Sequence, residues 1–172
     1  MATDMTYLRR LGAFLLAGVA VMLSAGWAAG DARATSLDAE VRAALRNGPT
    51  GGRQIGPNEV AWAKQGVTMT VAARGKMEPV NYRECPRLYV CLWQDRDATG
   101  RRIQFKEYGT YRLRAWGMSG RRGASSYYNH QCCLAGAELG FGFRPPTRLD
   151  LWTWGNIPRH LNDRATYVRL YP

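Results

Sequence analysis

The sequence predicts an all-β fold, a sandwich of short strands preceded by a short helix and a β-hairpin. After Asn47 no long stretch repeats apolar residues at helical spacing. Short runs instead alternate between two faces, and glycine or proline interrupts them at intervals of roughly ten residues, as in an antiparallel sandwich. The 172 residues are 46% apolar, 11% aromatic and 22% charged, which is a globular composition. This length suits one domain with a small extension.

Residues 1–34 have the features of a signal peptide. Arg9 and Arg10 precede the apolar run Leu11–Leu23, and Ala32 and Ala34 form an A-x-A cleavage motif. The apolar run of 13 residues is shorter than the roughly 20 that a membrane-spanning helix needs. We therefore expect cleavage after Ala34, secretion into the extracellular medium and no membrane span.

The next segment begins with a predicted helix. Leu37, Val41 and Leu45 recur every four residues and give one apolar stripe over residues 36–47. Gly48 and Pro49 then end the helical pattern. This helix opens an N-terminal extension that we place at residues 35–82.

A hairpin completes the extension. Val60 and Trp62 alternate with alanines, and apolar residues alternate again over 67–71. Residues 64–66 between them read as a turn, and residues 75–82 read as a linker.

Residues 83–172 are expected to form the main β domain. Cys91 and Trp93 alternate with Val90 and Leu92, so this run should present two faces. The strands expected in this domain are residues 88–93, 103–105, 111–113, 125–128, 139–143, 149–154 and 166–171.

Charge and motif content limit the function classes. The net charge is +11, and two histidines exclude a histidine-rich metal site. The chain has no H-E-x-x-H, no G-x-S-x-G and no phosphate loop, so we expect no enzyme, no catalytic residues, no cofactor and no bound metal. Six arginines instead suggest a basic patch for an anionic cell-wall polymer, the alternative function of a cell-envelope-binding, antimicrobial module. They are Arg101, Arg102, Arg112, Arg114, Arg121 and Arg122.

The four cysteines, Cys85, Cys91, Cys132 and Cys133, are expected to form disulfides if the chain is secreted. The spacing of the first two suits a local clasp. The last two are adjacent, and a bond between them would be strained. Four cysteines allow three connectivities, so crossed pairs between the two groups stay open as well.

The run from Cys85 to Trp93, continued by residues 100–105, resembles a known family. Its pattern is C-P-x-x-x-V-C-L-W, a polar turn, then G-R-R-I-Q-F. It is similar to the secreted βγ-crystallin-like proteins of peptidase inhibitor family thirty-six, whose type member is a metalloproteinase inhibitor. The steps at residues 124–126 and 165–168 match the family further, so the resemblance covers about residues 83–172.

The resemblance implies a βγ-crystallin-like sandwich of two Greek keys. In that fold Trp93 starts a tight corner, and Gly100 supplies the positive φ that the corner needs. Ala98 stands where the family has a second aromatic residue, and Ser125 or Ser126 is expected to bond back to the hairpin.

Calcium binding, which many such modules show, is expected to be weak or absent. Asn162 and Asp163 match the second calcium loop, but Arg121 and Arg122 stand where the first loop needs oxygen ligands. The loop at Asn162 is then expected to be a structural turn.

The resemblance also implies the function. We expect a secreted, monomeric peptidase inhibitor whose partner is an extracellular protease, specifically a metalloprotease. By position, the inhibitory bond would be Cys133–Leu134, because thermolysin-like enzymes cut before a large apolar residue. Unlike the family's type member, this chain has no loop between its second pair of cysteines.

Overall fold

The structure is a computed structural model that describes residues 25–72, 82–133 and 135–172, with side chains from Ser36 onward. The chain divides into two compact units, Met1–Ala34 and Thr35–Pro172, and the description below concerns the second. Its helices are α1 (Ala25–Asn47, which begins in the first unit), η1 (Ala63–Gln65), η2 (Tyr82–Glu84), η3 (Leu113–Trp116), η4 (Gly120–Arg122) and η5 (Arg159–Leu161). Its strands are β1 (Arg53–Gly56), β2 (Glu59–Trp62), β3 (Val67–Thr70), β4 (Val90–Trp93), β5 (Arg102–Phe105), β6 (Gly109–Arg112), β7 (Ser126–Asn129), β8 (Gly136–Phe141), β9 (Arg144–Leu149), β10 (Trp154–Asn156) and β11 (Tyr167–Tyr171).

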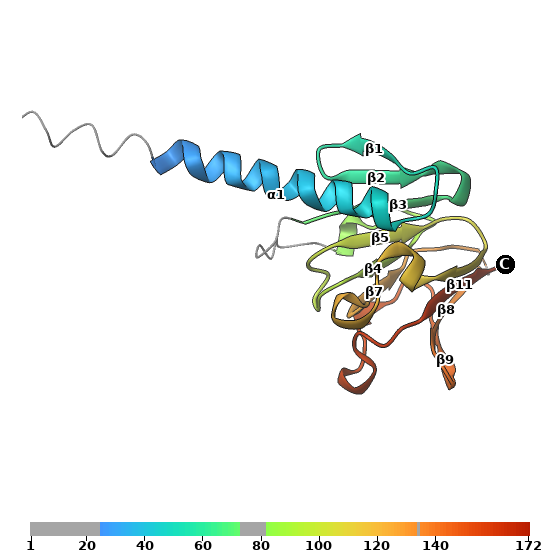
Figure 1. Cartoon of the computed structure of the whole chain (residues 1–172). Helices are drawn as coiled ribbons and strands as arrows, with labels where there is room; N and C mark the ends of the chain where they lie inside the picture. The colour runs from blue at the N-terminus through green and yellow to red at the C-terminus, as the bar shows by residue number, and fades with distance from the viewer. Residues whose placement is uncertain (1–24, 73–81, 134) are drawn as a thin grey trace, which may run out of the picture. The chain divides into compact units, whose positions relative to one another are not determined.

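The strands form two antiparallel sheets (Figure 1), so the predicted all-β class is confirmed. Sheet A has seven strands in the order β1-β2-β3-β5-β4-β7-β10, and sheet B has four in the order β6-β11-β8-β9. From β5 onward the chain passes between the two sheets five times. Strand β6 pairs with β11 in sheet B, and β10 pairs with β7 in sheet A, so each sheet holds one strand from the other half of the domain.

The expected hairpin is present and is part of sheet A. Strands β2 and β3 pair around η1, and β3 continues the sheet by pairing with β5, from Val67↔Phe105 to Thr70↔Arg102. A third strand, β1, which the sequence did not predict, pairs with β2 at the sheet edge. The extension thus shares a sheet with the main domain.

One hydrophobic core joins the two sheets and the end of α1. Val90, Leu92, Ile103 and Phe105 point into it from sheet A, and all are fully buried. Sheet B contributes alternate residues of β8 and β11, and α1 contributes Val41 and Ala44. Helix α1 therefore packs on the same side of sheet A as sheet B does.

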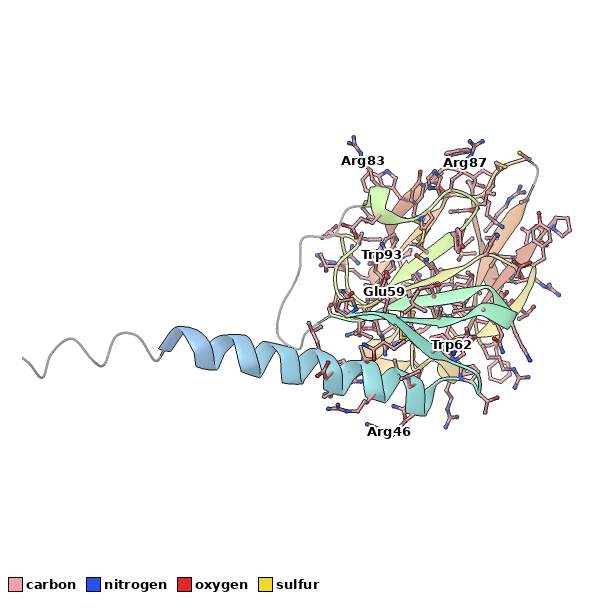
Figure 2. All side chains as sticks on the ribbon, turned by 90° about the horizontal axis from the view of Figure 1, so that it is seen from above. Arg46, Glu59, Trp62, Arg83, Arg87 and Trp93 are labelled. Atoms are coloured by element: carbon pink, nitrogen blue, oxygen red, sulfur yellow. A yellow bond between two sulfur atoms is a disulfide. The ribbon has the colours of Figure 1, made fainter. Side chains whose placement is uncertain are left out.

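Trp62 ties the extension to this core. The ring is fully buried, and its Nε1 donates to the Pro49 carbonyl oxygen at 2.7 Å, just after α1 ends. It meets Trp116 edge-on at a centroid distance of 5.0 Å. Figure 2 shows Trp62 beside the last turns of α1, whereas Arg46 extends into solvent. At Gly48 a Cβ atom would lie 2.4 Å from the Trp62 ring, so the chain after α1 needs glycine there.

Two sequence predictions differ from the structure. The helix begins at Ala25 rather than at Ser36, so it runs through the boundary between the two units. The strand expected over 149–154 is instead a turn between β9 and β10. Strand β9 escaped prediction because Pro145 and Pro146 interrupt its pattern, which an edge strand tolerates. The expected linker at 75–82 lies mostly outside the described residues.

Candidate functional site

The segment between β7 and β8, residues 130–135, contains the predicted inhibitory bond. Leu134 lies outside the described residues, so the structure places only the Cys133 side of that bond. Cys133 is exposed and has a φ of 63°, in the left-handed region. The Ala135 amide donates to the Cys132 carbonyl oxygen at 3.3 Å, so a hydrogen bond joins the two residues that flank the predicted bond.

Buried polar contacts fix the base of this loop. The Asn129 side chain is fully buried, and its Nδ2 donates to the Leu149 carbonyl oxygen at 2.7 Å. Its Oδ1 accepts from the Gln131 amide at 3.2 Å. The loop therefore starts from a residue that is bonded both to β9 and to the loop itself.

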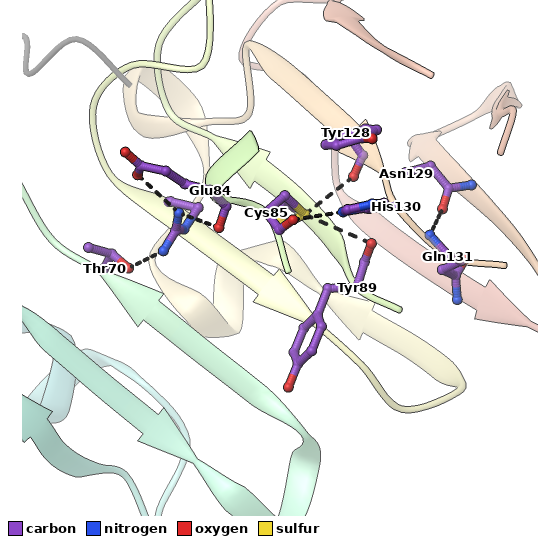
Figure 3. Close-up of a disulfide and its surroundings, with 10 residues drawn as sticks. Thr70, Glu84, Cys85, Tyr89, Tyr128, Asn129, His130 and Gln131 are labelled. Atoms are coloured by element: carbon purple, nitrogen blue, oxygen red, sulfur yellow. Dashed lines mark hydrogen bonds and ion pairs between the residues drawn. A yellow bond between two sulfur atoms is a disulfide. The ribbon is translucent and has the colours of Figure 1, made fainter. Parts of the chain in front are cut away.

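The Cys85–Cys91 disulfide supports the same base. The sulfurs are bonded, as the local clasp predicted, and Cys85 and Cys91 are both buried. Figure 3 shows His130 beside this disulfide, with its Nδ1 2.7 Å from the Cys85 carbonyl oxygen. Because that oxygen only accepts, Nδ1 carries the proton. The Leu88 amide donates to the His130 carbonyl oxygen at 2.8 Å, and the His130 amide donates to the Tyr89 carbonyl oxygen at 2.9 Å, so three hydrogen bonds join the disulfide segment to the loop.

Cys132 and Cys133 are both thiols in the structure. The adjacent disulfide and the crossed pairs that the sequence left open are therefore not formed, and the expectation of two disulfides is corrected to one. The neighbouring Cys132, which shares a hydrogen bond with it, raises the pKa of the Cys133 thiol. A raised pKa keeps this exposed thiol protonated at neutral pH, which is the reverse of what a cysteine nucleophile requires.

A pocket of about 270 Å³ opens beside the loop. Gln131 and Cys133 of the loop line it together with Leu88 and with Lys106 and Tyr108 of the exposed β5–β6 turn. The loop tip is thus accessible along one flank while its base is fixed.

The predicted tight corner is present in the first half of the domain. Trp93 is fully buried, and Gly100 has a φ of 76°. Of the two candidate serines it is Ser126 that bonds back to the corner. Its hydroxyl accepts from the Ala98 amide at 3.0 Å and donates to the Asp95 carbonyl oxygen at 2.7 Å.

Tyr82 packs against the buried cluster that contains Trp93 and Ala98. Its ring meets Trp93 edge-on at 5.5 Å and lies 4.2 Å from the ring of Trp154. Burial raises the pKa of Tyr82, as expected for a phenol packed between two indoles.

The loop at Asn162 and Asp163 is a bonded turn. Asp163 accepts from the Ser125 hydroxyl at 3.3 Å and from the Asn162 side-chain amide at 2.8 Å. Thr166 is bonded to the β8–β9 hairpin through the Gly140 carbonyl oxygen at 3.1 Å. In the described part of the chain, no three His, Cys, Asp or Glu residues cluster as a metal site would require.

The six arginines do not form the single patch that the sequence suggested. Arg102 donates to the Glu84 carboxylate at 3.3 Å and to the Thr70 hydroxyl at 3.1 Å, on the outer face of sheet A. Arg101 points the other way, because consecutive residues of an extended chain face opposite sides. It lines a pocket with Arg114 and Arg122, and Arg112 lines a neighbouring pocket with Arg114.

Sequence reasoning missed Asn129 and His130 as residues that hold the loop. Their partners, Leu149 and Cys85, are 20 and 45 residues away in the chain, so no local pattern marks them.

Among the described helices, none is long and apolar enough to cross a membrane.

Comparison with known proteins gives one match. Residues 78–135, about a third of the chain, match the model of peptidase inhibitor family I36. The match ends at the loop described above, and it confirms the resemblance that the cysteine-bearing run predicted. No curated protein and no solved structure matches the chain.

Proposed function

Since residues 78–135 are those of a peptidase inhibitor family, we propose that this protein inhibits extracellular metalloproteases through the loop 130–135. The family match itself supports a peptidase as the partner. The metalloprotease target, the inhibitory bond Cys133–Leu134 and the extracellular location are parts of the proposal.

The observation that carries this proposal is a loop with a fixed base and an exposed tip. An inhibitor loop enters the protease cleft as a substrate would, and a loop already held in shape loses less conformational entropy on binding. Here Asn129 and His130 fix the base, Asn129 through a buried hydrogen bond and His130 through a half-buried one, and Cys133 is exposed at the tip. The Cys85–Cys91 disulfide braces the loop from beside it, in place of a disulfide within the loop.

The placement of β6 in sheet B and of β10 in sheet A supports a βγ-crystallin-like double Greek key as the fold of residues 83–172. Strands β4–β7 would form the first key and β8–β11 the second, and the third strand of each lies in the other's sheet. Ser126 and Thr166 bond back to the first hairpin of their own key in the same manner. The loop 130–135 then joins the two keys.

Leu134→Gly tests the proposal. Removing the apolar side chain that follows the bond should raise the inhibition constant against a thermolysin-like protease at least about tenfold, or about 1.4 kcal/mol. The matched control is Phe143→Gly, which removes an exposed apolar side chain at the opposite end of β8.

Two outcomes would count against the proposal. Equal inhibition by Leu134→Gly and the wild type, with circular dichroism showing both folded, would exclude this bond. A wild-type protein that inhibits neither metallo- nor serine proteases, with or without reductant, would exclude the function.

A further inference from the structure

A second pocket lies beside the last turns of α1, and it shares no lining residue with the pocket beside the loop 130–135. The last turns of α1 form one wall, with Glu40 and Asn47. The wall facing them carries Arg101, Arg114 and Arg122. Its volume is about 170 Å³. A water molecule occupies about 30 Å³ of liquid, so the site has room for a small anion but not for a large ligand.

Arg101 is the fixed element of this site. Its Nη2 donates to the Gly117 carbonyl oxygen, and Gly117 ends η3 in a left-handed conformation with a φ of 65°. Its Nε is buried and has no hydrogen-bond partner among the described residues. Arg101 therefore brings a guanidinium group that is held in place by the backbone to the lining of the pocket.

The charge balance around Arg101 favours a negatively charged ligand. Three arginines line the pocket against one acidic residue, half-buried Glu40. Burial lowers the pKa of Arg101, and the positive charge of Arg122 lowers it further, whereas Glu40 raises it. The net positive charge in this small volume is therefore only partly balanced by the protein.

We propose that the pocket between α1 and Arg101, Arg114 and Arg122 binds a tetrahedral oxyanion, a phosphate or sulfate group. Guanidinium groups present planar pairs of donors that match such oxygens. Several arginines around one small site suit an anion with more than one charge. Trp116 and the alanines of α1 line the rest of the pocket and leave room for the oxyanion group rather than for a bulky ligand.

Thermal unfolding of the purified protein in phosphate, sulfate and chloride at equal ionic strength tests this. Either oxyanion at ten times its dissociation constant should raise the wild-type Tm by about 3–6 °C over chloride. Arg114→Ala and Arg122→Ala should lose most of this shift. Arg121→Ala is the matched control, because Arg121 is exposed and adjacent but does not line the pocket, so its shift should stay.

A second readout separates a binding site from a general salt effect. In chloride, Arg122→Ala should be at least as stable as the wild type, because it removes a like charge beside Arg101. In phosphate the order should reverse. Equal shifts in all four proteins, or none in the wild type, would overturn the proposal.

A free phosphate ion and a phosphate group of a polymer would bind to the same arginines. A last experiment therefore compares the binding of inorganic phosphate with that of polyphosphate. Polyphosphate at equal phosphate concentration should bind more tightly than inorganic phosphate only if the pocket takes polymer-borne groups. Protease inhibition by Arg122→Ala should equal that of the wild type, because Arg122 lies outside the loop 130–135. The Tm shifts therefore test the oxyanion site, and the inhibition constants separately test the inhibitor proposal.

Discussion

Ser126 shows how one side chain can hold a tight corner. Its hydroxyl is buried and makes two bonds to the hairpin between β4 and β5, one through the Ala98 amide and one through the Asp95 carbonyl oxygen. Ala98 itself has a φ of 56°, so the hydroxyl holds a backbone conformation that alanine rarely adopts.

Ser126→Ala should therefore lower the free energy of unfolding by about 1–3 kcal/mol, because it leaves a buried amide and a carbonyl without a partner. Urea unfolding followed by fluorescence measures this. Ser119→Ala, at an exposed serine, is the control and should stay within about 0.5 kcal/mol of the wild type. A loss no larger than that of the control would show that water replaces the hydroxyl.

For single residues, the sequence predicted the contacts that join residues at a fixed, short spacing in the chain. Trp93, Gly100 and the serine form a pattern of fixed distances along the chain, so the corner could be expected. Asn129 and His130 could not be identified, because their bonds join residues that only the folded sheets bring together. The pairing of Cys85 with Cys91 was favoured for its spacing, whereas the sequence left the partners of Cys132 and Cys133 open, and both are thiols in the structure.

Among the elements, the three strands of the extension lengthen sheet A beyond the strands of the main domain. Helix α1 packs on the same side, and Trp62 joins the helix end to β2. Alternation in β2 and β3 predicted the hairpin, but nothing local showed that β3 would pair with β5. Edge strands β1 and β9 were missed because a solvated edge needs no apolar alternation, and their residues are mostly exposed.

Trp62→Phe should destabilise the protein by about 2 kcal/mol or more, since it leaves a cavity and removes the bond to the Pro49 carbonyl. Trp154→Phe is the matched control, because that indole is 59% exposed, and its cost should be much smaller. Equal midpoints of urea unfolding for the two variants would show that the extension does not share the core's stability.

For the molecule as a whole, the sequence predicts a chain that is processed after Ala34. The boundary between the two compact units falls at the same point, between Ala34 and Thr35, within α1. The intact mass of protein from the culture medium should correspond to a chain that begins at Thr35. A mass equal to that of all 172 residues would contradict the prediction.

The placement of β6 in sheet B and of β10 in sheet A determines what happens if a protease cuts the loop 130–135. The N-terminal fragment would leave β6 in sheet B, and the C-terminal fragment would leave β10 in sheet A. Neither fragment could depart without breaking a strand pair in both sheets and opening the shared core. The nicked chain would stay assembled with its new ends near each other, so that the reverse reaction, resealing of the bond, competes with release.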